Sequence, residues 1–587
     1  MDRDDVSVEK LIEQSEFQFE NEDYLAAKKT LLAAKKIATN KPEIWSNLAY
    51  INYLLGKYSE GESSARQAIN LNPKFVAAYS NLSLILSAQH RYQESVECLN
   101  AAIKVDPNMA DLWINLGLSY MGNYQIENAK NAFAKAIALV PNSAVAYCNL
   151  ALCEQETGQV EKAYKLYQKA LEFDSNLRPA ISNRLMCAQY HPSLTSKELK
   201  DAAIHATQSI DVRDSNQVEV STRERLRIGF VGGDFRAHPV GWFLKDVFVI
   251  LARHFDCYCY ANQTEKEDAI FKQFFNAARH WHNIYGLNKR QVVEIIKQDN
   301  IDVLIDLSGH TAANRLDVFA DRIASFQISW LGYPASTGLT NIDAVLLSDD
   351  LIVQSSSSFF CEKVLALPGP QFVYRAPSYL PELSEPPCLK NGYITYGCFN
   401  NIAKINDSVL CCWASLLCAV PSARLLLKWK TLVSPSVVNI ILKRLHTLGI
   451  ESSRVDCRGV SPHKEMLQEY NEVDIALDPF PFSGALTSFE AISMGVPVIT
   501  LYTDRPISRQ TYSINKALGL DEFSVKTPRQ YVKIAHQLAN DVEYLTVLRK
   551  NLRGSMRESQ LYNYELMANQ FMYTISDLYN NHEKSPA

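Results

Sequence analysis

The stretch PEIWSNLAYINYLLGKYSEGESSARQAINLNPKF, residues 42–75, decides the fold of the first third of the chain. Its pattern recurs with a period of 34 residues, and the recurring positions hold an aromatic residue, a leucine, a small residue, an alanine and a proline. These residues are Trp45, Tyr79, Trp113 and Tyr147; Leu48, Leu82, Leu116 and Leu150; Gly61, Ser95, Ala129 and Ala163; Ala68, Ala102, Ala136 and Ala170; and Pro73, Pro107 and Pro141. Each unit therefore predicts two helices that approach closely at the small residue and end at the proline.

The repeat extends in both directions from this stretch. A degenerate unit precedes it over about residues 8–41, and a final unit spans about residues 144–177. The period and the residue types resemble those of tetratricopeptide repeats, whose units contact mainly their neighbours. We therefore predict an all-α tetratricopeptide solenoid over residues 1–190.

Asparagine keeps the same period on the first helix of each unit, the helix that lines the concave face of such solenoids. The residues are Asn47, Asn81, Asn115, Asn149 and Asn183. A ladder of amides can donate to and accept from the main chain of an extended peptide, so we predict that these residues bind a protein or peptide acceptor in the groove. Two alternatives stay open: the asparagines are solvated, or they tie neighbouring helices together.

Beyond residue 190 the period disappears, and apolar strands alternate with helices. Residues 191–222 are polar and predict a connector. One domain, residues 223–380, has predicted strands at 226–234, 256–263, 302–309, 326–332 and 343–350. A second domain, residues 381–587, has them at 393–399, 423–429, 454–459, 474–480 and 497–502 and ends in a helical stretch. Such strands indicate two doubly wound parallel sheets, whose ligands bind beyond the carboxyl ends of the strands.

Composition argues against several classes of protein. The 587 residues are 47% hydrophobic and 21% charged, as in globular chains, and the net charge of −5 argues against binding to nucleic acid. The chain lacks an apolar run of about 18–20 residues, the length that a membrane span needs, and it begins MDRDDVSVEK, unlike a signal peptide. The 13 cysteines include no C-x-x-C pair, so we expect a cytoplasmic protein without a metal site or a disulfide framework.

Two strand ends of the first domain carry residues suited to acid–base chemistry. In GGDFRAHPVG, residues 232–241, His238 precedes a predicted helix and can act as a base near neutral pH. The alternative is a surface histidine that caps a turn. In DLSGHTAANR, residues 306–315, the polar candidates are Asp306, His310, Thr311 and Arg315.

Two strand ends of the second domain suit an anionic ligand. In CFNNIAKIN, residues 398–406, Lys404 can neutralise a diphosphate, although a lone lysine is usually solvated. Thr487 lies where a helix opens after Ser483-Gly484, and free backbone N–H groups at such a start favour a phosphate. Glu490, one turn further, can accept from a ribose diol. Alternatively, Thr487 and Glu490 form a capping box that only satisfies the helix end.

The ordered set of motifs is more specific than any one of them. A tetratricopeptide array followed by DFRAHP, DLSGHT, QISWLGYPASTG, CFNNIAKI and DPFPFSGALTSFEAISMGVPVIT resembles the O-linked N-acetylglucosamine transferase and SPINDLY group, family 41 of the glycosyltransferases. The resemblance implies a GT-B fold, in which two Rossmann-like domains hold a nucleotide-sugar between them. It also implies transfer to Ser or Thr of polypeptides, inversion at the anomeric carbon, and no required metal or cofactor.

The resemblance assigns roles to residues at matching positions. His238 matches a histidine that lines the sugar pocket and is a candidate base, and Asp299 matches an acid that could assist deprotonation of the acceptor. Lys404 matches the phosphate-binding lysine, and Asn401 matches an amide that contacts the base of the nucleotide. The further matches are Ser461, Pro462 and His463 for the segment that meets uracil, Ala485, Leu486 and Thr487 for the His-Thr-Thr that contacts the phosphates, and Glu490 for the aspartate that binds the ribose.

The chain departs from that pattern at the donor site. Ala485 and Leu486 lack two side-chain donors, His463 replaces a lysine, and Met466 replaces a histidine. We expect UDP-GlcNAc as the donor, with GDP-fucose or UDP-glucose as the alternatives that a SPINDLY-like transferase would use. A non-catalytic repeat scaffold with a decayed transferase domain is a rival hypothesis, and a transferase acting on a sugar polymer or small molecule is a third.

Overall fold

The structure, a computed structural model, describes residues 3–208, 210, 223–264 and 268–582. Contacts divide the chain into two compact units. One comprises Met1–Cys153, Lys165–Ala180 and Ile284–Ile295; the other comprises Glu154–Tyr164, Ile181–Asn283 and Ile296–Ala587. The predicted connector contains a helix, α12 (Ser196–Thr207), while its residues 209 and 211–222 lie outside the described part. The predicted domain boundaries stay predictions.

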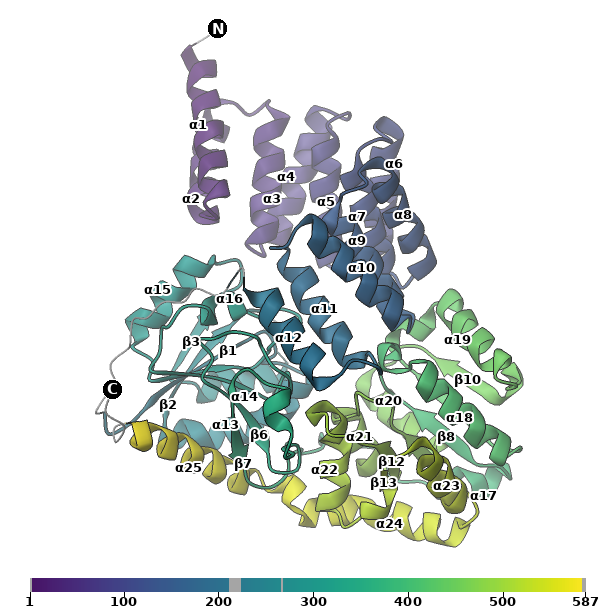
Figure 1. The fold of residues 1–587 in the computed structure, drawn as a ribbon. Helices are drawn as coiled ribbons and strands as arrows, with labels where there is room; N and C mark the ends of the chain where they lie inside the picture. Colours follow the sequence, from purple (N-terminus) through teal and green to yellow (C-terminus); the bar gives the residue numbers. More distant parts are fainter. Residues whose placement is uncertain (1–2, 209, 211–222, 265–267, 583–587) are drawn as a thin grey trace. The chain divides into compact units, whose positions relative to one another are not determined.

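The repeat region consists of the predicted pairs of helices, α1 to α10, followed by the further helix α11 (Figure 1). They are α1 Arg3–Glu20, α2 Tyr24–Ile37, α3 Pro42–Leu54, α4 Tyr58–Leu71, α5 Val76–Ala88, α6 Tyr92–Val105, α7 Ala110–Gly122, α8 Ile126–Leu139, α9 Ala144–Glu156, α10 Val160–Phe173 and α11 Arg178–Tyr190. The small-residue position is tightly packed, since a Cβ at Gly61 would lie 2.9 Å from Ile85 Cδ1. Ser95 and Ala129, at the same position of later units, are fully buried. The predicted solenoid is confirmed.

The second unit contains two parallel sheets, as predicted. The first has the order β3-β2-β1-β4-β5-β6-β7. Its strands are β1 Arg227–Gly232, β2 Asp256–Ala261, β3 His280–Asn283, β4 Val303–Asp306, β5 Phe326–Trp330, β6 Ala344–Ser348 and β7 Lys363–Leu367, and the helices between them are α13 Pro239–His254, α14 Ala269–Ala277, α15 Lys289–Asp299 and α16 Leu316–Phe319. The central strands β4 and β5 are buried throughout, which fits their mostly apolar sequences, and their buried polar side chains, such as Asp306 and Ser329, bond to each other. We call this sheet and the helices packed on it the first lobe.

The second sheet has the order β10-β9-β8-β11-β12-β13 and forms the second lobe with its helices. Its strands are β8 Thr395–Cys398, β9 Arg424–Lys428, β10 Val455–Arg458, β11 Ile475–Leu477, β12 Val498–Leu501 and β13 Ser524–Val525. Its helices are α17 Pro387–Asn391, α18 Asp407–Ala419, α19 Pro435–Thr447, α20 His463–Glu469, α21 Leu486–Ser493, α22 Gln510–Ala517, α23 Pro528–Ala539 and α24 Val542–Glu558. Two doubly wound lobes after a repeat array are the GT-B arrangement that the motifs implied.

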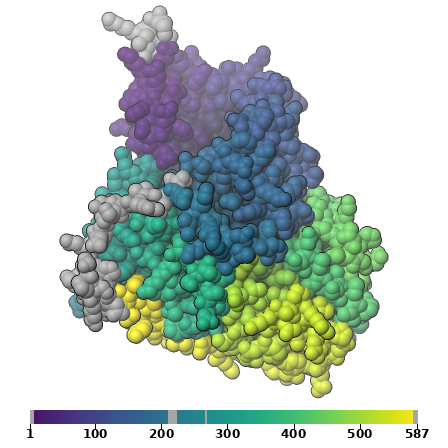
Figure 2. All heavy atoms as spheres, in the orientation of Figure 1, coloured from purple at the N-terminus to yellow at the C-terminus, as the bar shows by residue number. Residues whose placement is uncertain are grey.

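The last helix, α25 (Tyr564–His582), returns to the first lobe. Phe571 stacks on Trp330 of β5 with ring centres 4.6 Å apart, and Tyr579 packs against Phe326 at 5.8 Å. In Figures 1 and 2 the yellow end of the chain accordingly lies beside the teal first lobe. The C-terminal helix α25 therefore packs on the first lobe, although it follows the second lobe in the sequence.

The two lobes contact each other through aromatic and charged side chains. Phe243 of α13 stacks on Phe372 at 4.3 Å and contacts Phe489 of α21 at 5.7 Å. Asp350, after β6, pairs with Lys516 of α22 at 2.6 Å.

Among the described residues, no helix combines the length and apolarity that crossing a membrane requires.

Candidate functional site

Lys404 lies at the carboxyl edge of the second sheet, in the 3-10 turn Ile402–Lys404 that follows β8. Its Nζ donates to the carbonyl oxygen of Ser483 at 2.8 Å and to Asn400 Oδ1 at 3.1 Å, and it lies 4.3 Å from the centre of the Phe482 ring. Burial lowers the pKa of Lys404 to about 8, and the charge of Asp478 opposes that shift. An ammonium has three N–H donors, so the two acceptors found among the described residues leave one donor for a ligand.

Helix α21 begins beside this lysine. Its N-cap is Ala485, whose side chain cannot cap, and within the described residues the N–H groups of Ala485, Leu486 and Thr487 find no acceptor. The Thr487 hydroxyl donates to Asn400 Oδ1 at 3.2 Å, the same oxygen that binds Lys404. The capping-box alternative is therefore wrong, because Thr487 is the second residue of the helix and not its N-cap.

Asp478 fixes the turn between β11 and α21. This buried carboxylate accepts from the Gly484 N–H at 2.5 Å and from the Thr500 hydroxyl at 2.7 Å, and burial raises the pKa of Asp478 to about 6. A Cβ at Gly484 would lie 2.9 Å from Asp478 Oδ1, so the turn requires a glycine here. The Gly484 N–H is used inside the protein, which leaves the N–H groups of residues 485–487, the candidate anion site, available to a ligand.

A second group forms around His463, the first residue of α20. Its Nε2 lies 2.8 Å from Glu490 Oε1 and its Nδ1 lies 2.9 Å from the Tyr379 hydroxyl, while its ring stacks on Trp242 of the first lobe at 5.9 Å. Burial raises the pKa of Glu490, and the hydrogen bond from His463 opposes that rise. The structure thus brings together the residues predicted to meet the base and the ribose, and Glu490 shares α21 with Thr487 of the anion site.

The other residues predicted for the nucleotide base take local structural positions. The Asn401 side chain accepts from the Ala403 N–H at 3.0 Å and caps the turn that carries Lys404. Pro462 is the N-cap residue of α20. The Ser461 hydroxyl donates to Glu469, at the other end of the same helix, at 2.9 Å.

His238 lies at the carboxyl edge of the first sheet, immediately before α13. Its Nδ1 lies 3.3 Å from Asp234 Oδ2, and 38% of its side chain is exposed. Burial of the ring lowers the pKa of His238, while Asp234 opposes that shift. The imidazole makes no hydrogen bond to the helix it precedes, so the alternative of a turn-capping histidine is wrong.

Asp299 belongs neither to the group around Lys404 nor to the group around His463. It ends α15, and its carboxylate accepts from the Tyr260 hydroxyl at 2.8 Å and lies 2.9 Å from His282 Nε2. Its carbonyl accepts from Arg227, the first residue of β1, at 2.7 Å. These partners place Asp299 beside the strands β1, β2 and β3, so it holds its helix to the sheet.

The second polar loop of the first lobe serves the fold. Asp306 accepts from the Ser308 N–H at 3.0 Å and from the Ser329 hydroxyl at 2.8 Å. His310 lies 2.8 Å from the Thr337 carbonyl oxygen through Nε2, and burial lowers the pKa of His310 to about 4. The two side chains are therefore engaged by the protein itself.

Two members of the asparagine ladder tie repeats together. Asn81 Nδ2 donates to the Ser46 carbonyl oxygen at 3.0 Å and to its hydroxyl at 2.9 Å, and Asn115 Nδ2 donates to the Ser80 hydroxyl at 2.6 Å. All five asparagines are partly exposed. Asn81 and Asn115 therefore tie neighbouring helices together, as one of the two alternatives stated. Peptide binding by the five asparagines stays a prediction.

Sequence reasoning missed Asn400, Trp242 and Tyr379. Asn400 could have been predicted, because it lies in the same segment after β8 as Lys404. Trp242 and Tyr379 gave no local signal, since only the packing of the first lobe and of the proline-rich segment against α20 brings them to His463. Taken together, the site offers an ammonium and free N–H groups to an anion, beside a carboxylate and aromatic rings.

Comparisons with known proteins agree with this arrangement. The model of Glycosyl transferase family 41 matches residues 181–389 and 385–571, and tetratricopeptide repeat models match residues 42–75, 84–123 and 114–177. A solved O-GlcNAc transferase mutant from Thermobaculum terrenum is 27% identical, with a TM-score of 0.80, over 86% of this chain and 97% of that one.

The chain spans little more than a third of the length of the curated relatives that it matches. The Petunia hybrida "Probable UDP-N-acetylglucosamine--peptide N-acetylglucosaminyltransferase SPINDLY" is 36% identical over 57% of this chain and 37% of its own. The Arabidopsis thaliana SEC protein, named for the same reaction, is 27% identical over 57% of this chain and 35% of its own. The chain therefore matches little more than a third of these relatives.

Proposed function

Because the chain belongs to glycosyl transferase family 41, we propose that it transfers a sugar from a nucleotide-sugar to a Ser or Thr hydroxyl of a polypeptide. The observation that carries this proposal is the meeting of Lys404 and Thr487 on Asn400 Oδ1, at 3.1 and 3.2 Å. It brings an ammonium to the start of α21, whose free N–H groups suit a diphosphate. Glu490 and His463 lie where the ribose and base of the same nucleotide would follow.

The reaction we propose is a direct displacement. The acceptor oxygen bonds to the anomeric carbon from the face opposite the diphosphate, the bond from that carbon to the phosphate oxygen breaks, and the configuration inverts. Negative charge grows on the departing nucleoside diphosphate, and stabilising it is the largest demand on the protein. Lys404 and the N–H groups of residues 485–487 meet that demand, and they replace the two side-chain donors absent at Ala485 and Leu486.

The acceptor hydroxyl must also lose its proton. His238 is better suited to this role than Asp299, because it lies at a carboxyl edge beside Asp234 and its ring is only partly buried. Its lowered pKa keeps the imidazole neutral, and so able to accept a proton, at neutral pH. We assign Asp299 no part in the reaction.

The donor and the acceptor are further parts of the proposal. UDP-GlcNAc is the first donor to test, with GDP-fucose and UDP-glucose as the alternatives, and the acceptor is a polypeptide held in the solenoid groove. The 13 cysteines are all free thiols, most of them buried, which supports a reducing compartment such as the cytoplasm.

Radiolabelled donors test the proposal directly. The full chain is incubated with UDP-GlcNAc, UDP-glucose or GDP-fucose and a proteome extract, and label is followed into protein and into free sugar. The matched control is Lys404→Ala. We expect label on Ser or Thr of proteins from one donor, and far less of it with the variant.

Other patterns would contradict the proposal. Label that appears only in small molecules or glycans would point to a transferase without a protein acceptor. A chain that binds none of the three donors would fit the non-catalytic scaffold.

A further inference from the structure

We infer that Lys428 and Glu469 are positioning residues that hold the loop 459–462 in the shape that binds the base of the donor. The inference rests on the proposed function and deepens it. Neither residue belongs to the set predicted from sequence, and neither contacts Lys404 or Glu490 in the structure. Their part is to fix the segment that leads into His463.

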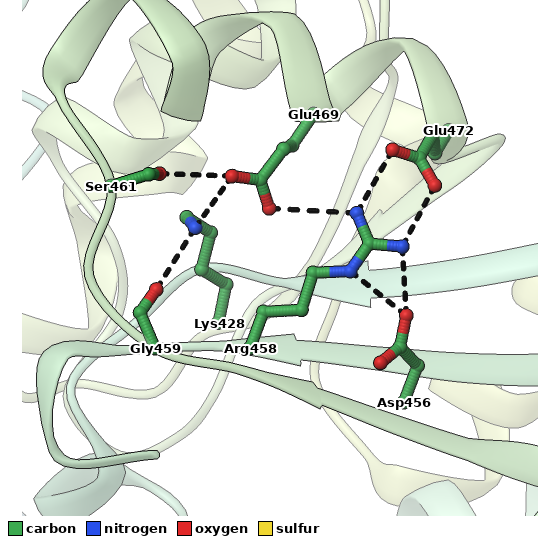
Figure 3. A network of polar contacts seen from close by, with 7 residues as sticks. All are labelled: Lys428, Asp456, Arg458, Gly459, Ser461, Glu469 and Glu472. Carbon is green, nitrogen blue, oxygen red and sulfur yellow. Dashed lines mark hydrogen bonds and ion pairs between the residues drawn. The ribbon is translucent and has the colours of Figure 1, made fainter. Parts of the chain in front are cut away.

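Lys428 is the last residue of the buried strand β9, and only 6% of its side chain is exposed. Its Nζ donates to the Gly459 carbonyl oxygen at 2.9 Å and to Glu469 Oε1 at 2.6 Å. The same Glu469 oxygen accepts from the Ser461 hydroxyl at 2.9 Å. Figure 3 shows the ammonium between Gly459 and Glu469, with Ser461 turned toward the carboxylate.

This buried pair ties both ends of α20 to the sheet. Glu469 ends the helix, while Ser461 and Pro462 come directly before it. The helix therefore cannot shift without breaking a bond to Lys428, which β9 holds rigidly. A Cβ at Gly459 would lie 2.2 Å from Val433 Cγ2, so the loop also packs closely against the 3-10 turn Lys430–Val433 that follows β9.

The position of α20 sets the position of His463, which is its first residue. His463 in turn bonds to Glu490 at 2.8 Å, next to the proposed ribose position. A side chain that binds a ligand well needs a support that fixes its orientation, and at metal sites the loss of such a support typically weakens binding about 10- to 100-fold. Removing the support should thus weaken nucleotide binding without touching the residues that stabilise the leaving group.

The outer half of the network offers a control. Arg458 pairs with Glu472 and Asp456, each at 2.7 Å, and the two acids are 56% and 53% exposed. Exposed pairs of this kind contribute little to stability. Arg458 also lies 3.5 Å from Glu469 Oε2, whereas Glu472 is joined only to Arg458 among the residues drawn in Figure 3. Glu472→Gln should therefore leave nucleotide binding unchanged.

The test uses the full chain and measures binding of UDP and of GDP by calorimetry, together with thermal unfolding. The main variant is Lys428→Met/Glu469→Met, because replacing both members of a buried pair by apolar residues tends to keep the fold, whereas removing one leaves a buried charge. Ser461→Ala is a second variant, which removes one tether and keeps the pair. Donor KM and kcat are measured for the same proteins.

We expect the double variant to bind the preferred nucleotide about tenfold more weakly or worse, with a raised donor KM, an unchanged kcat and wild-type unfolding. We expect Ser461→Ala to bind several-fold more weakly. Wild-type affinity in a folded double variant would overturn the inference; if that variant does not fold, wild-type affinity of Ser461→Ala would do so. A wild-type chain that binds neither nucleotide would instead overturn the proposed function, and this inference with it.

Discussion

The carboxyl edges of the two sheets carry similar polar residues but use them differently. At the edge of the first sheet, Asp306 and His310 each bond to groups of the protein at distances of 2.8–3.0 Å. At the edge of the second, Lys404 and the first turn of α21 converge on one amide oxygen and keep donors for a ligand. A polar residue after a strand is therefore a ligand-binding residue only when the protein leaves its hydrogen-bonding capacity unused.

The largest effect should come from removing the ammonium at the second edge. We expect Lys404→Ala to lower turnover about 10²- to 10³-fold, as the loss of one preorganised donor to a developing charge does in other enzymes. Steady-state kinetics with the preferred donor measure it. Lys533→Ala, an exposed lysine of α23, is the matched control and should behave like wild type. Equal turnover of the two variants would remove Lys404 from the mechanism.

Alkaline pH should gradually weaken donor binding at the carboxyl edge of the second sheet. The pKa of Lys404 in the free protein is about 8, below the usual value for lysine, because burial disfavours the charged form. Since the diphosphate binds the charged form, we expect donor affinity to fall as pH rises through about 8, by up to about tenfold per pH unit above it. Calorimetry with UDP or GDP at pH 7–9.5 measures this. Lys404→Ala should bind weakly with no such dependence, and a wild-type affinity that is flat over this range would contradict the assignment.

The loop that follows β4 at the first edge should respond in stability rather than in catalysis. Asp306→Ala would leave buried N–H and hydroxyl donors unpaired, so we expect the free energy of unfolding of the first lobe to fall by about 1–3 kcal/mol. Urea unfolding followed by tryptophan fluorescence measures the loss. The kcat/KM of the folded variant should stay close to wild type, and a loss of activity as large as that of Lys404→Ala would erase the difference between the two edges.

The smallest effect should lie in the solenoid. Asn81→Ala removes the hydrogen bonds to Ser46, each worth about 0.5–1.5 kcal/mol at most, so we expect a slight loss of stability of the repeats. A double-mutant cycle with Ser46→Ala isolates the side-chain part of this tie. A coupling energy near zero would show that the contact does not stabilise the array.

The regular elements were largely predictable, because period 34 and apolar strands are local signals. Among the described residues, β3, β7 and β13 lie outside the predicted strand ranges, and the physical cause is plain for β3 and β13. β3, HWHN, is an edge strand of polar and aromatic residues, half-exposed, so it lacks the apolar run of a buried strand. β13 is two residues long, too short to leave a pattern.

The site residues Lys404 and Thr487 were predictable, because their position after the end of a strand was a sufficient signal. A residue's role was not predictable where it depends on which groups of the folded protein accept or donate its hydrogen bonds. Asp306 and Lys404 both follow strands, yet one is satisfied within the protein and the other is not. The capping-box hypothesis failed because the start of α21, which tertiary contacts of Asp478 set, lies before Thr487.

A crystal structure with UDP or GDP bound tests the central claim most directly. We predict that the β-phosphate lies within hydrogen-bonding distance of Lys404 Nζ and of the N–H groups of residues 485–487. A diphosphate seated at the edge of the first sheet, or one with no contact to Lys404, would contradict it.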